Sequence, residues 1–117
     1  MVNTSSANGR LGSPYCSEYV ASKHGVLGLT RGAAYEAGTA GVRVNAVLPG
    51  VIGTPMVGEF TTNPDPKPLY DVALVRHSIG RVGELEDVGY VVKWLLSDES
   101  GSSMARVSRW MGGTWRG

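Results

Sequence analysis

A tyrosine and a lysine, Tyr19 and Lys23, stand four residues apart in the run Ser-Glu-Tyr-Val-Ala-Ser-Lys-His-Gly. On a helix, this spacing places two side chains on one face, about one turn apart. The lysine ammonium is expected to stabilise the tyrosine phenolate and lower the pKa of Tyr19 toward neutrality, and a helix that begins just before Tyr19 adds its dipole to that effect. A tyrosine tuned in this way can act as a general acid or base near pH 7.

The pair also has a purely structural interpretation, in which an amphipathic tyrosine packs beside a solvated lysine. Because tyrosine and lysine are common residues, the motif alone favours this plainer interpretation. Nearby side chains add little: Tyr15 has no lysine four residues on, and His24 is expected to point off the face that Tyr19 and Lys23 share. Whether the pair is catalytic or purely structural therefore depends on the helices and strands that would position it.

The first third of the chain predicts a strand, a loop and a long helix. Residues 1–6 are typical of the end of a strand, and residues 7–14 are rich in the Gly, Asn and Ser of a loop. The helix is predicted over Ser17–Ala37, with Ser17 as its N-cap. Three glycines inside it cost about 1 kcal/mol each relative to alanine. We expect close packing to offset that cost at Gly25, Gly28 and Gly32.

The remainder predicts one more buried strand and one more helix. Residues 42–48 are mostly apolar, which is typical of a strand inside a parallel sheet. Residues 54–74 contain four prolines and are too long for an ordinary connection, so we expect a functional lid or a partly ordered segment. Residues 84–96 predict a helix whose apolar face recurs at three- and four-residue steps. That face comprises Leu85, Val88, Val92 and Leu95.

Four segments, in this order, resemble the short-chain dehydrogenase/reductase family. Residues 2–6 are similar to the end of the strand that carries the family's catalytic serine, and Ser6 lies 13 positions before Tyr19, the family's usual spacing. The Tyr-x-x-x-Lys signature follows at Tyr19. Residues 41–56 are similar to the family's next strand, its Pro-Gly turn and its cofactor loop. Residues 80–88 resemble the Gly-Arg-x-Gly start of a late helix, so the resemblance covers nearly the whole chain.

The resemblance implies an α/β fold of the doubly wound parallel-sheet (Rossmann-like) type. The family opens with a βαβ unit whose glycine-rich turn holds the cofactor pyrophosphate, and this sequence has no such fingerprint. We therefore expect residues 1–117 to be the C-terminal, catalytic portion of a single truncated oxidoreductase domain, with its N-terminal βαβ half missing. The tail departs from the family's pattern, since Met111 stands where an Asp is usual, and Arg106 and Arg109 fall in a strand that should be buried.

The resemblance also implies a reaction, hydride transfer between NAD or NADP and a small alcohol or carbonyl substrate. Tyr19 would exchange a proton with the substrate oxygen. Lys23 would hold the pKa of Tyr19 down and bind the nicotinamide ribose. Ser6 would donate a hydrogen bond to the substrate oxygen. Besides Tyr19 and Lys23, the implied cofactor-binding residues are Pro49, Gly50, Ile52 and Thr54.

Several of these residues have plainer alternatives. Ser6 would equally serve as a loop hydroxyl bonded to nearby backbone, and its neighbour Ser5 differs from it only in the 13-residue spacing. The segment up to Thr54 would equally form a turn that ends a strand and caps a helix. An apolar trio beyond it would form either a substrate wall or a plain helix face. The trio is Met56, Val57 and Phe60.

Composition excludes several other classes of protein. The net charge of +1 gives no electrostatic footprint for nucleic acid or an anionic membrane. No apolar run is long enough to span a bilayer, and the two His and one Cys lack metal-ligand spacing, so neither a membrane span nor a metal is expected. The lone Cys16 cannot form an internal disulfide, which fits a cytoplasmic location.

The sequence is consistent with two functional hypotheses. The first is a short-chain-type enzyme that is a homo-oligomer in its full-length form. The second is a truncated, catalytically idle fragment that keeps the site residues and acts at most as a subunit-interaction module. An exposed edge of the parallel sheet would make such a fragment prone to aggregation.

Overall fold

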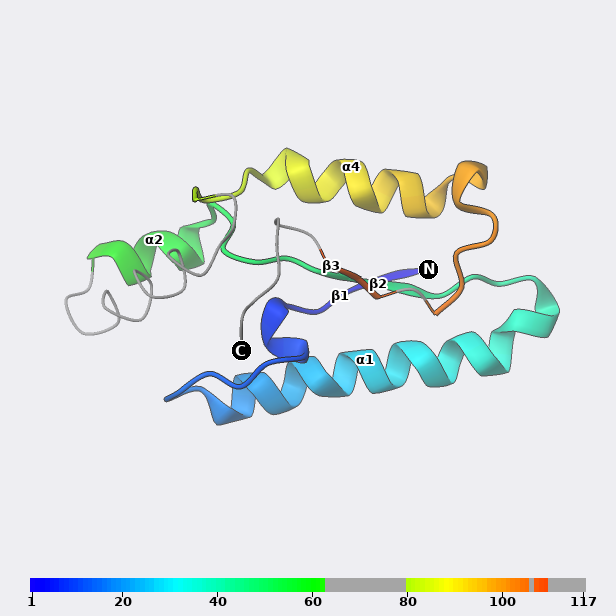
Figure 1. Cartoon of the computed structure of the whole chain (residues 1–117), viewed down its shortest axis with the longest axis horizontal. Coiled ribbons are helices and arrows are strands. Elements are labelled where there is room, and N and C mark those ends of the chain that lie inside the picture. The colour runs from blue at the N-terminus through cyan, green and yellow to red at the C-terminus, as the bar shows by residue number, and fades with distance from the viewer. Residues whose placement is uncertain (63–79, 106, 110–117) are drawn as a thin grey trace.

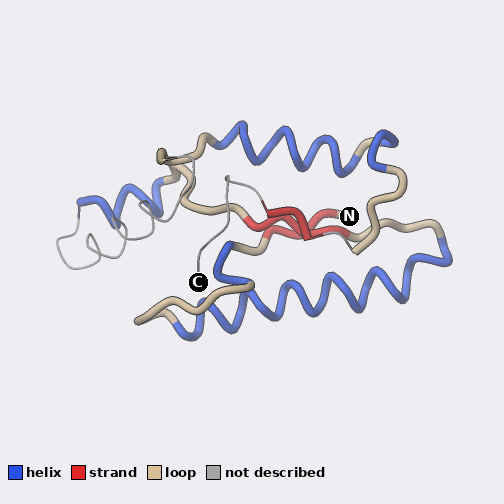
Figure 2. The backbone as a smooth tube through the Cα atoms, in the orientation of Figure 1, coloured by secondary structure: helices blue, strands red, loops and turns tan. Residues whose placement is uncertain are grey.

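A computed structural model describes residues 1–62, 80–105 and 107–109. Among these residues, three parallel strands form a sheet in the spatial order β1-β2-β3, with β1 at Val2–Thr4, β2 at Asn45–Leu48 and β3 at Val107–Arg109. Helix α1 (Ser17–Ala37) covers one face of the sheet, and helix α4 (Leu85–Leu96) covers the other (Figures 1 and 2). This arrangement of three layers confirms the prediction of an α/β fold with a parallel sheet.

The central strand β2 carries the core. All four of its residues are buried, as expected of a strand with helices on both faces. Ala46 and Leu48 pack with Leu27 of α1 in one apolar cluster. The strand begins at Asn45 rather than at the predicted residue 42, because the N–H of Val42 donates to the carbonyl of Ala37 in the turn that ends α1.

Helix α1 has the predicted bounds, but its N-cap differs by one residue. Cys16 occupies the N-cap position without a side-chain cap bond, so the prediction of Ser17 as N-cap is wrong. The buried residues of α1 are Leu27, Thr30 and Ala34, which recur at three- and four-residue steps. A short 3-10 turn follows, and Gly41 ends it in the left-handed region at φ 77°. Glycine tolerates that conformation without strain.

The three glycines of α1 are not packed against other described residues. A Cβ placed at each would meet no atom within 4 Å among the described residues, at Gly25, Gly28 and Gly32 alike. The described residues of this chain therefore supply none of the close packing expected at these glycines, and packing against a second subunit stays a prediction. The outer face of α1 keeps a helix-propensity penalty that alanine would remove.

Replacement of Gly28 by alanine is expected to stabilise the chain by up to about 1 kcal/mol, because Ala loses less backbone entropy on folding than Gly. Urea unfolding measures the change. Gly9→Ala is the opposite control, since a Cβ there would lie 2.4 Å from the Ser5 Oγ. A loss of stability at Gly28 would instead show that something covers this face in solution.

Helix α4 begins at Leu85, with Glu84 at its N-cap, one residue later than predicted. The N–H of Glu84 donates to the Asp87 Oδ2 at 3.0 Å, which satisfies a donor at the helix start. Along its apolar face, exposure falls from 58% at Leu85 to 1% at Leu95. Of the predicted apolar face, Leu95 is therefore buried and Leu85 is exposed.

The guanidinium of Arg43 holds the end of α4 against the start of β2. Its Nη1 donates to the carbonyls of Leu95 and Ser100, each at 3.0 Å, and to the Ser100 Oγ at 2.7 Å. Its Nη2 donates to the carbonyl of Ser97 at 2.9 Å. The last carbonyls of a helix lack partners within the helix, and a cation complements the negative end of the helix dipole. We call this set of bonds the Arg43 clamp.

Part of the predicted lid is helical. Helix α2 (Pro55–Thr62) covers its first residues, while residues 63–79 lie outside the described part of the chain. Met56 is exposed and Val57 is half-buried, which leaves both interpretations of the apolar trio open. The Phe60 side chain lies outside the described residues, as do the predictions made for Arg106 and Met111.

Candidate active site

The strand that carries Ser6 runs on beyond β1 alongside the end of β2. The N–H of Ser5 donates to the carbonyl of Val47, and the N–H of Ala7 donates to the carbonyl of Pro49, each at 2.9 Å. Pairing of the parallel type thus extends two rungs past β1. Ser6 is thereby held between two residues that are bonded to the strand end from which the predicted cofactor loop departs.

The same strand end is bonded to α1 at the turn of the predicted lysine. The Ser5 Oγ donates to the carbonyl of Lys23 at 2.8 Å, and Ser5 is only 4% exposed. Further along the helix, the Asn3 Nδ2 donates to the Thr30 Oγ1 at 3.0 Å. These two bonds join β1 to α1 directly, so the serine segment and the Tyr-x-x-x-Lys segment meet.

Tyr19 and Lys23 lie together on α1, which confirms the prediction that they share a face. The Lys23 Nζ stands 5.4 Å from the centroid of the Tyr19 ring, within the range of a cation–π contact. Tyr19 is 38% exposed, so its phenol can be reached from solvent. The helical period places both side chains on the same stripe as the buried Leu27 and Thr30, which is the stripe that faces the sheet.

Ser6 makes the local bond of its plainer interpretation. Its Oγ accepts from the N–H of Asn8 at 3.2 Å and caps the short 3-10 helix Ala7–Gly9. Accepting that bond uses a lone pair, so the hydroxyl hydrogen of Ser6 can still be donated. The capping bond and a bond to a substrate oxygen are therefore compatible.

The predicted cofactor loop is fixed by pairing with a distant glycine. The N–H of Gly83 donates to the carbonyl of Val51, and the N–H of Gly53 donates to the carbonyl of Gly83, each at 2.9 Å. These two bonds flank Ile52, which forms an isolated parallel bridge with Gly83. In such a bridge, the flanked residue directs its own N–H and C=O to the opposite side. The N–H of Ile52 is thus directed away from Gly83.

Thr54 ends the loop by starting helix α2. Its Oγ1 accepts from the N–H of Val57 at 3.4 Å, and its carbonyl accepts from the N–H of Gly58 at 2.9 Å. Pro55 stands at the first helical position, where its missing N–H costs nothing. The helix-cap interpretation of Thr54 is confirmed, and it leaves the hydroxyl hydrogen of Thr54 able to donate.

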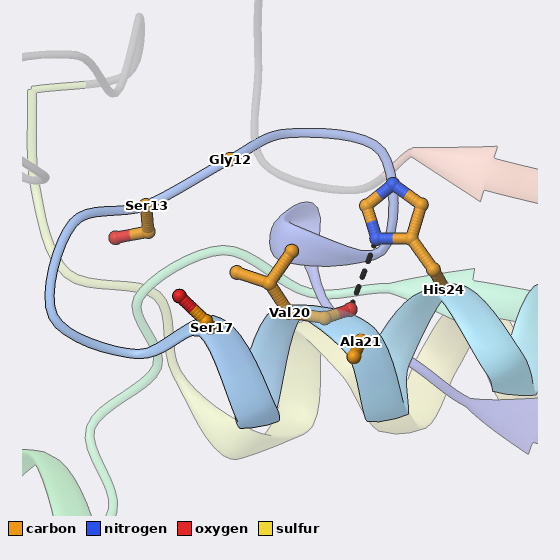
Figure 3. A pocket seen from close by; sticks show the side chains of 6 residues that line it. All are labelled: Gly12, Ser13, Ser17, Val20, Ala21 and His24. Carbon is orange, nitrogen blue, oxygen red and sulfur yellow. Dashed lines mark hydrogen bonds between the residues drawn. The ribbon is translucent and has the colours of Figure 1, made fainter.

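A surface pocket of about 360 Å³ lies on another face of α1 (Figure 3). Residues that recur every three or four positions on α1 line it, together with the loop before the helix: Gly12, Ser13, Ser17, Val20, Ala21 and His24. The His24 Nδ1 donates to the carbonyl of Val20 at 3.0 Å, as Figure 3 shows. At 100° per residue, the mean direction of the lining α1 residues lies about 130° from that of Tyr19 and Lys23, and Val20, at the edge of the pocket, lies about 60° from Lys23. The pocket and the pair are thus distinct, as expected for His24.

Two contacts that organise the site were missed from the sequence. Ser5 was set aside in favour of Ser6, although its position two residues after Asn3 on a strand was a signal that both face the same side. The pairing of Ile52 with Gly83 joins segments far apart in the chain, and no local pattern indicates it.

In the described residues, no three His, Cys, Asp or Glu side chains gather to hold a metal ion. No helix among them is long and apolar enough to cross a membrane.

Comparisons with known proteins match this chain to dehydrogenases and reductases. A family model described as "Enoyl-(Acyl carrier protein) reductase" matches residues 1–112. Cyclohexanol dehydrogenase of Acinetobacter sp. (strain SE19) is 45% identical over 101 residues, which cover 86% of this chain and 37% of that protein. The chain thus spans about two fifths of that relative's length.

Two solved structures with cofactors in their descriptions are also similar. F189W actinorhodin polyketide ketoreductase with NADPH matches with a TM-score of 0.85 and 30% identity over 98% of this chain and 46% of its own. 4-Hydroxyisoleucine dehydrogenase complexed with NADH matches with a TM-score of 0.84 and 30% identity, and the match also covers 98% of this chain and 46% of that chain. The likeness again covers less than half of each of these chains.

Proposed function

Because the chain belongs to the short-chain dehydrogenase/reductase family, we propose that it supplies the catalytic part of an NAD(P)-dependent oxidoreductase. Its fold class is the doubly wound, Rossmann-like one of that family. The proposed reaction is hydride transfer between a nicotinamide and the carbon of a small alcohol or carbonyl compound. Residues 1–117 are proposed as the C-terminal portion of a single catalytic domain.

One observation carries the proposal: three segments that hold candidate residues meet at the carboxyl ends of β1 and β2. The Ser5 Oγ is bonded to the carbonyl of Lys23, and the N–H of Ala7 is bonded to the carbonyl of Pro49. Ligands of open α/β sheets bind outside the carboxyl ends of the strands. The serine, the Tyr-x-x-x-Lys pair and the Pro-Gly turn are therefore gathered where a cofactor and substrate are expected.

Three side chains of this chain have separate roles in the proposed reaction. The Tyr19 hydroxyl would give its proton to a carbonyl oxygen in reduction, or take the hydroxyl proton in oxidation. The Lys23 ammonium, 5.4 Å from the Tyr19 ring, would stabilise negative charge as it develops on the phenol oxygen. The Ser6 hydroxyl would donate to the substrate oxygen and hold it in place.

The residues of the turn suit the nicotinamide end of the cofactor. When bound, the nicotinamide supplies or accepts the hydride. The N–H of Ile52, directed away from Gly83, is a donor suited to a carboxamide oxygen, and the Thr54 hydroxyl stands two residues on. Pro49 and Gly50 would form the wall of that site. Both NAD and NADP remain in the proposal, since the similar structures include one with NADPH and one with NADH.

Titration of the chain with NADH and NADPH, read by cofactor fluorescence alongside a thermal melt, tests this proposal. Saturable binding and a cofactor-shifted melt are expected. Lys23→Met should weaken binding about tenfold or more, because a hydrogen bond to a charged group is worth about 1.5–3 kcal/mol. Lys93→Met is the matched control, since Lys93 is an exposed lysine of α4. Cyclohexanol is the first substrate to try, because a relative is named for it.

Absence of binding, with no cooperative melt, would favour the competing hypothesis of an idle fragment that contacts another subunit. The exposed outer face of α1, where the described residues leave three glycines uncovered, is the observation that favours this alternative. The predicted homo-oligomer, the cytoplasmic location and the absence of a metal stay predictions.

A further inference from the structure

We propose that Ser5 is a positioning residue, which, with the Asn3–Thr30 bond, fixes how far helix α1 lies along strand β1. It would thereby set where Tyr19 and Lys23 stand relative to the strand ends. The inference rests on the proposed function and adds to it a residue that the catalytic motif does not contain. Ser5 acts through the main chain of Lys23 and touches neither substrate nor cofactor.

The two bonds form a pair of fixed points. Asn3 and Ser5 are two residues apart, so they lie on one face of the strand, about 6.6 Å apart along it. Lys23 and Thr30 are seven residues apart, which places them two turns apart on one helix face, about 10.5 Å apart along the axis. The order is reversed between the two elements, since Asn3 binds Thr30 and Ser5 binds Lys23. An antiparallel helix and strand satisfy both bonds at one axial position only.

Apolar packing alone would not fix that position. Leu27 and Ala34 are buried against the sheet, but such contacts are non-directional. A slide by one helical turn, about 5.4 Å, would exchange one apolar contact for another. The same slide would break both polar bonds and leave the Ser5 hydroxyl, which is 4% exposed, without its acceptor, while the Thr30 hydroxyl would keep its bond to the carbonyl of Val26 within α1.

Gly9 closes over the Ser5 bond and shields it. A Cβ at Gly9 would lie 2.4 Å from the Ser5 Oγ and 3.0 Å from the carbonyl oxygen of Lys23. The 3-10 turn that contains Gly9 therefore approaches the bond as closely as a backbone without a side chain permits. The bond is thus held from three sides, by β1, by α1 and by the turn between them.

Kinetics and amide hydrogen exchange of four variants test the proposal. Ser5→Ala is expected to lower kcat about tenfold or more with KM within about twofold, because a misplacement near 1 Å can cost up to about 10²-fold in rate. Ser5→Thr, which keeps the hydroxyl, should restore kcat. Thr30→Val should also lower kcat, because it removes the acceptor of the other bond. Ser22→Ala is the matched control, since the Ser22 Oγ donates to the carbonyl of Tyr19 within α1 itself.

Amide exchange provides a readout that is independent of the reaction. Faster exchange in the turn of Lys23, with α4 unchanged, is expected for Ser5→Ala and not for Ser22→Ala. Faster exchange with an unchanged kcat would overturn the positioning role and leave the proposed function standing. Unchanged amide exchange in Ser5→Ala would show that the bond from Ser5 to Lys23 does not hold helix α1 in place, and this result would also overturn the proposal. No turnover in the unsubstituted chain would instead contradict the proposed function, and exchange alone would then decide whether Ser5 holds the helix.

Discussion

Replacement of Tyr19 by phenylalanine is expected to lower turnover by about 10²–10⁴-fold, the usual contribution of a positioned general acid or base. The substitution removes one oxygen and keeps the ring that lies 5.4 Å from the Lys23 Nζ. The packing of that stripe of α1 should therefore survive, and the cofactor should still bind. Steady-state kinetics and a cofactor titration on the same preparation measure both effects.

Tyr15→Phe is the matched control for this experiment. Tyr15 lies four residues before Tyr19, is 91% exposed and has no lysine partner at the motif spacing, so its loss should leave turnover unchanged. Retained turnover in Tyr19→Phe would remove Tyr19 from its proposed role. Loss of turnover in both variants would point to a general disturbance of the helix start rather than to proton transfer.

The largest expected effect on stability comes from the Arg43 clamp. Arg43→Met should lower the free energy of unfolding by about 3 kcal/mol, because hydrogen bonds to a charged group are worth about 1.5–3 kcal/mol each. The loss is limited because the three carbonyls keep second donors in the Ser100 hydroxyl and the Ser103 N–H. The bonds at stake are those to Leu95, Ser97 and Ser100. Arg43→Lys should recover only part of the loss, since an ammonium lacks the planar fork that reaches several carbonyls.

Arg81→Met separates this clamp from an ordinary surface charge. The Arg81 Nη1 lies 3.6 Å from the Asp87 Oδ2, and its side chain is 52% exposed. A solvated pair of this kind contributes about 1 kcal/mol or less. Urea unfolding of both variants gives the comparison. Equal losses for Arg43→Met and Arg81→Met would mean that the clamp is no stronger than a surface pair.

The sequence predicted the elements that depend on local patterns. The bounds of α1 were predicted to the residue although its N-cap was placed one residue late, and the buried strand before Pro49 follows from its composition. The shared face of Tyr19 and Lys23 is a direct result of the helical period. The start of β2 was misplaced because residue 42 is used by the turn that ends α1, which composition does not reveal.

The contacts that assemble the site were not predictable in the same way. The Arg43 clamp and the Ile52–Gly83 bridge each join segments more than 30 residues apart, and their geometry exists only once both helices pack on the sheet. The uncovered glycines of α1 illustrate the reverse case. Their presence in a helix suggested close packing, yet whether a partner lies there depends on atoms beyond the described residues.

Helix α1 places its candidate chemistry and its packing on one stripe. Tyr19 and Lys23 continue the line of Leu27, Thr30 and Ala34, while the opposite side carries the glycines and the pocket lies between the two. Each position on the inner stripe therefore serves both the proposed chemistry and the packing against the sheet, so a substitution there that improves one puts the other at risk. The outer side serves neither the proposed chemistry nor packing against other described residues. Evolutionary change along this helix should accordingly be free to accumulate on one side and be confined on the other.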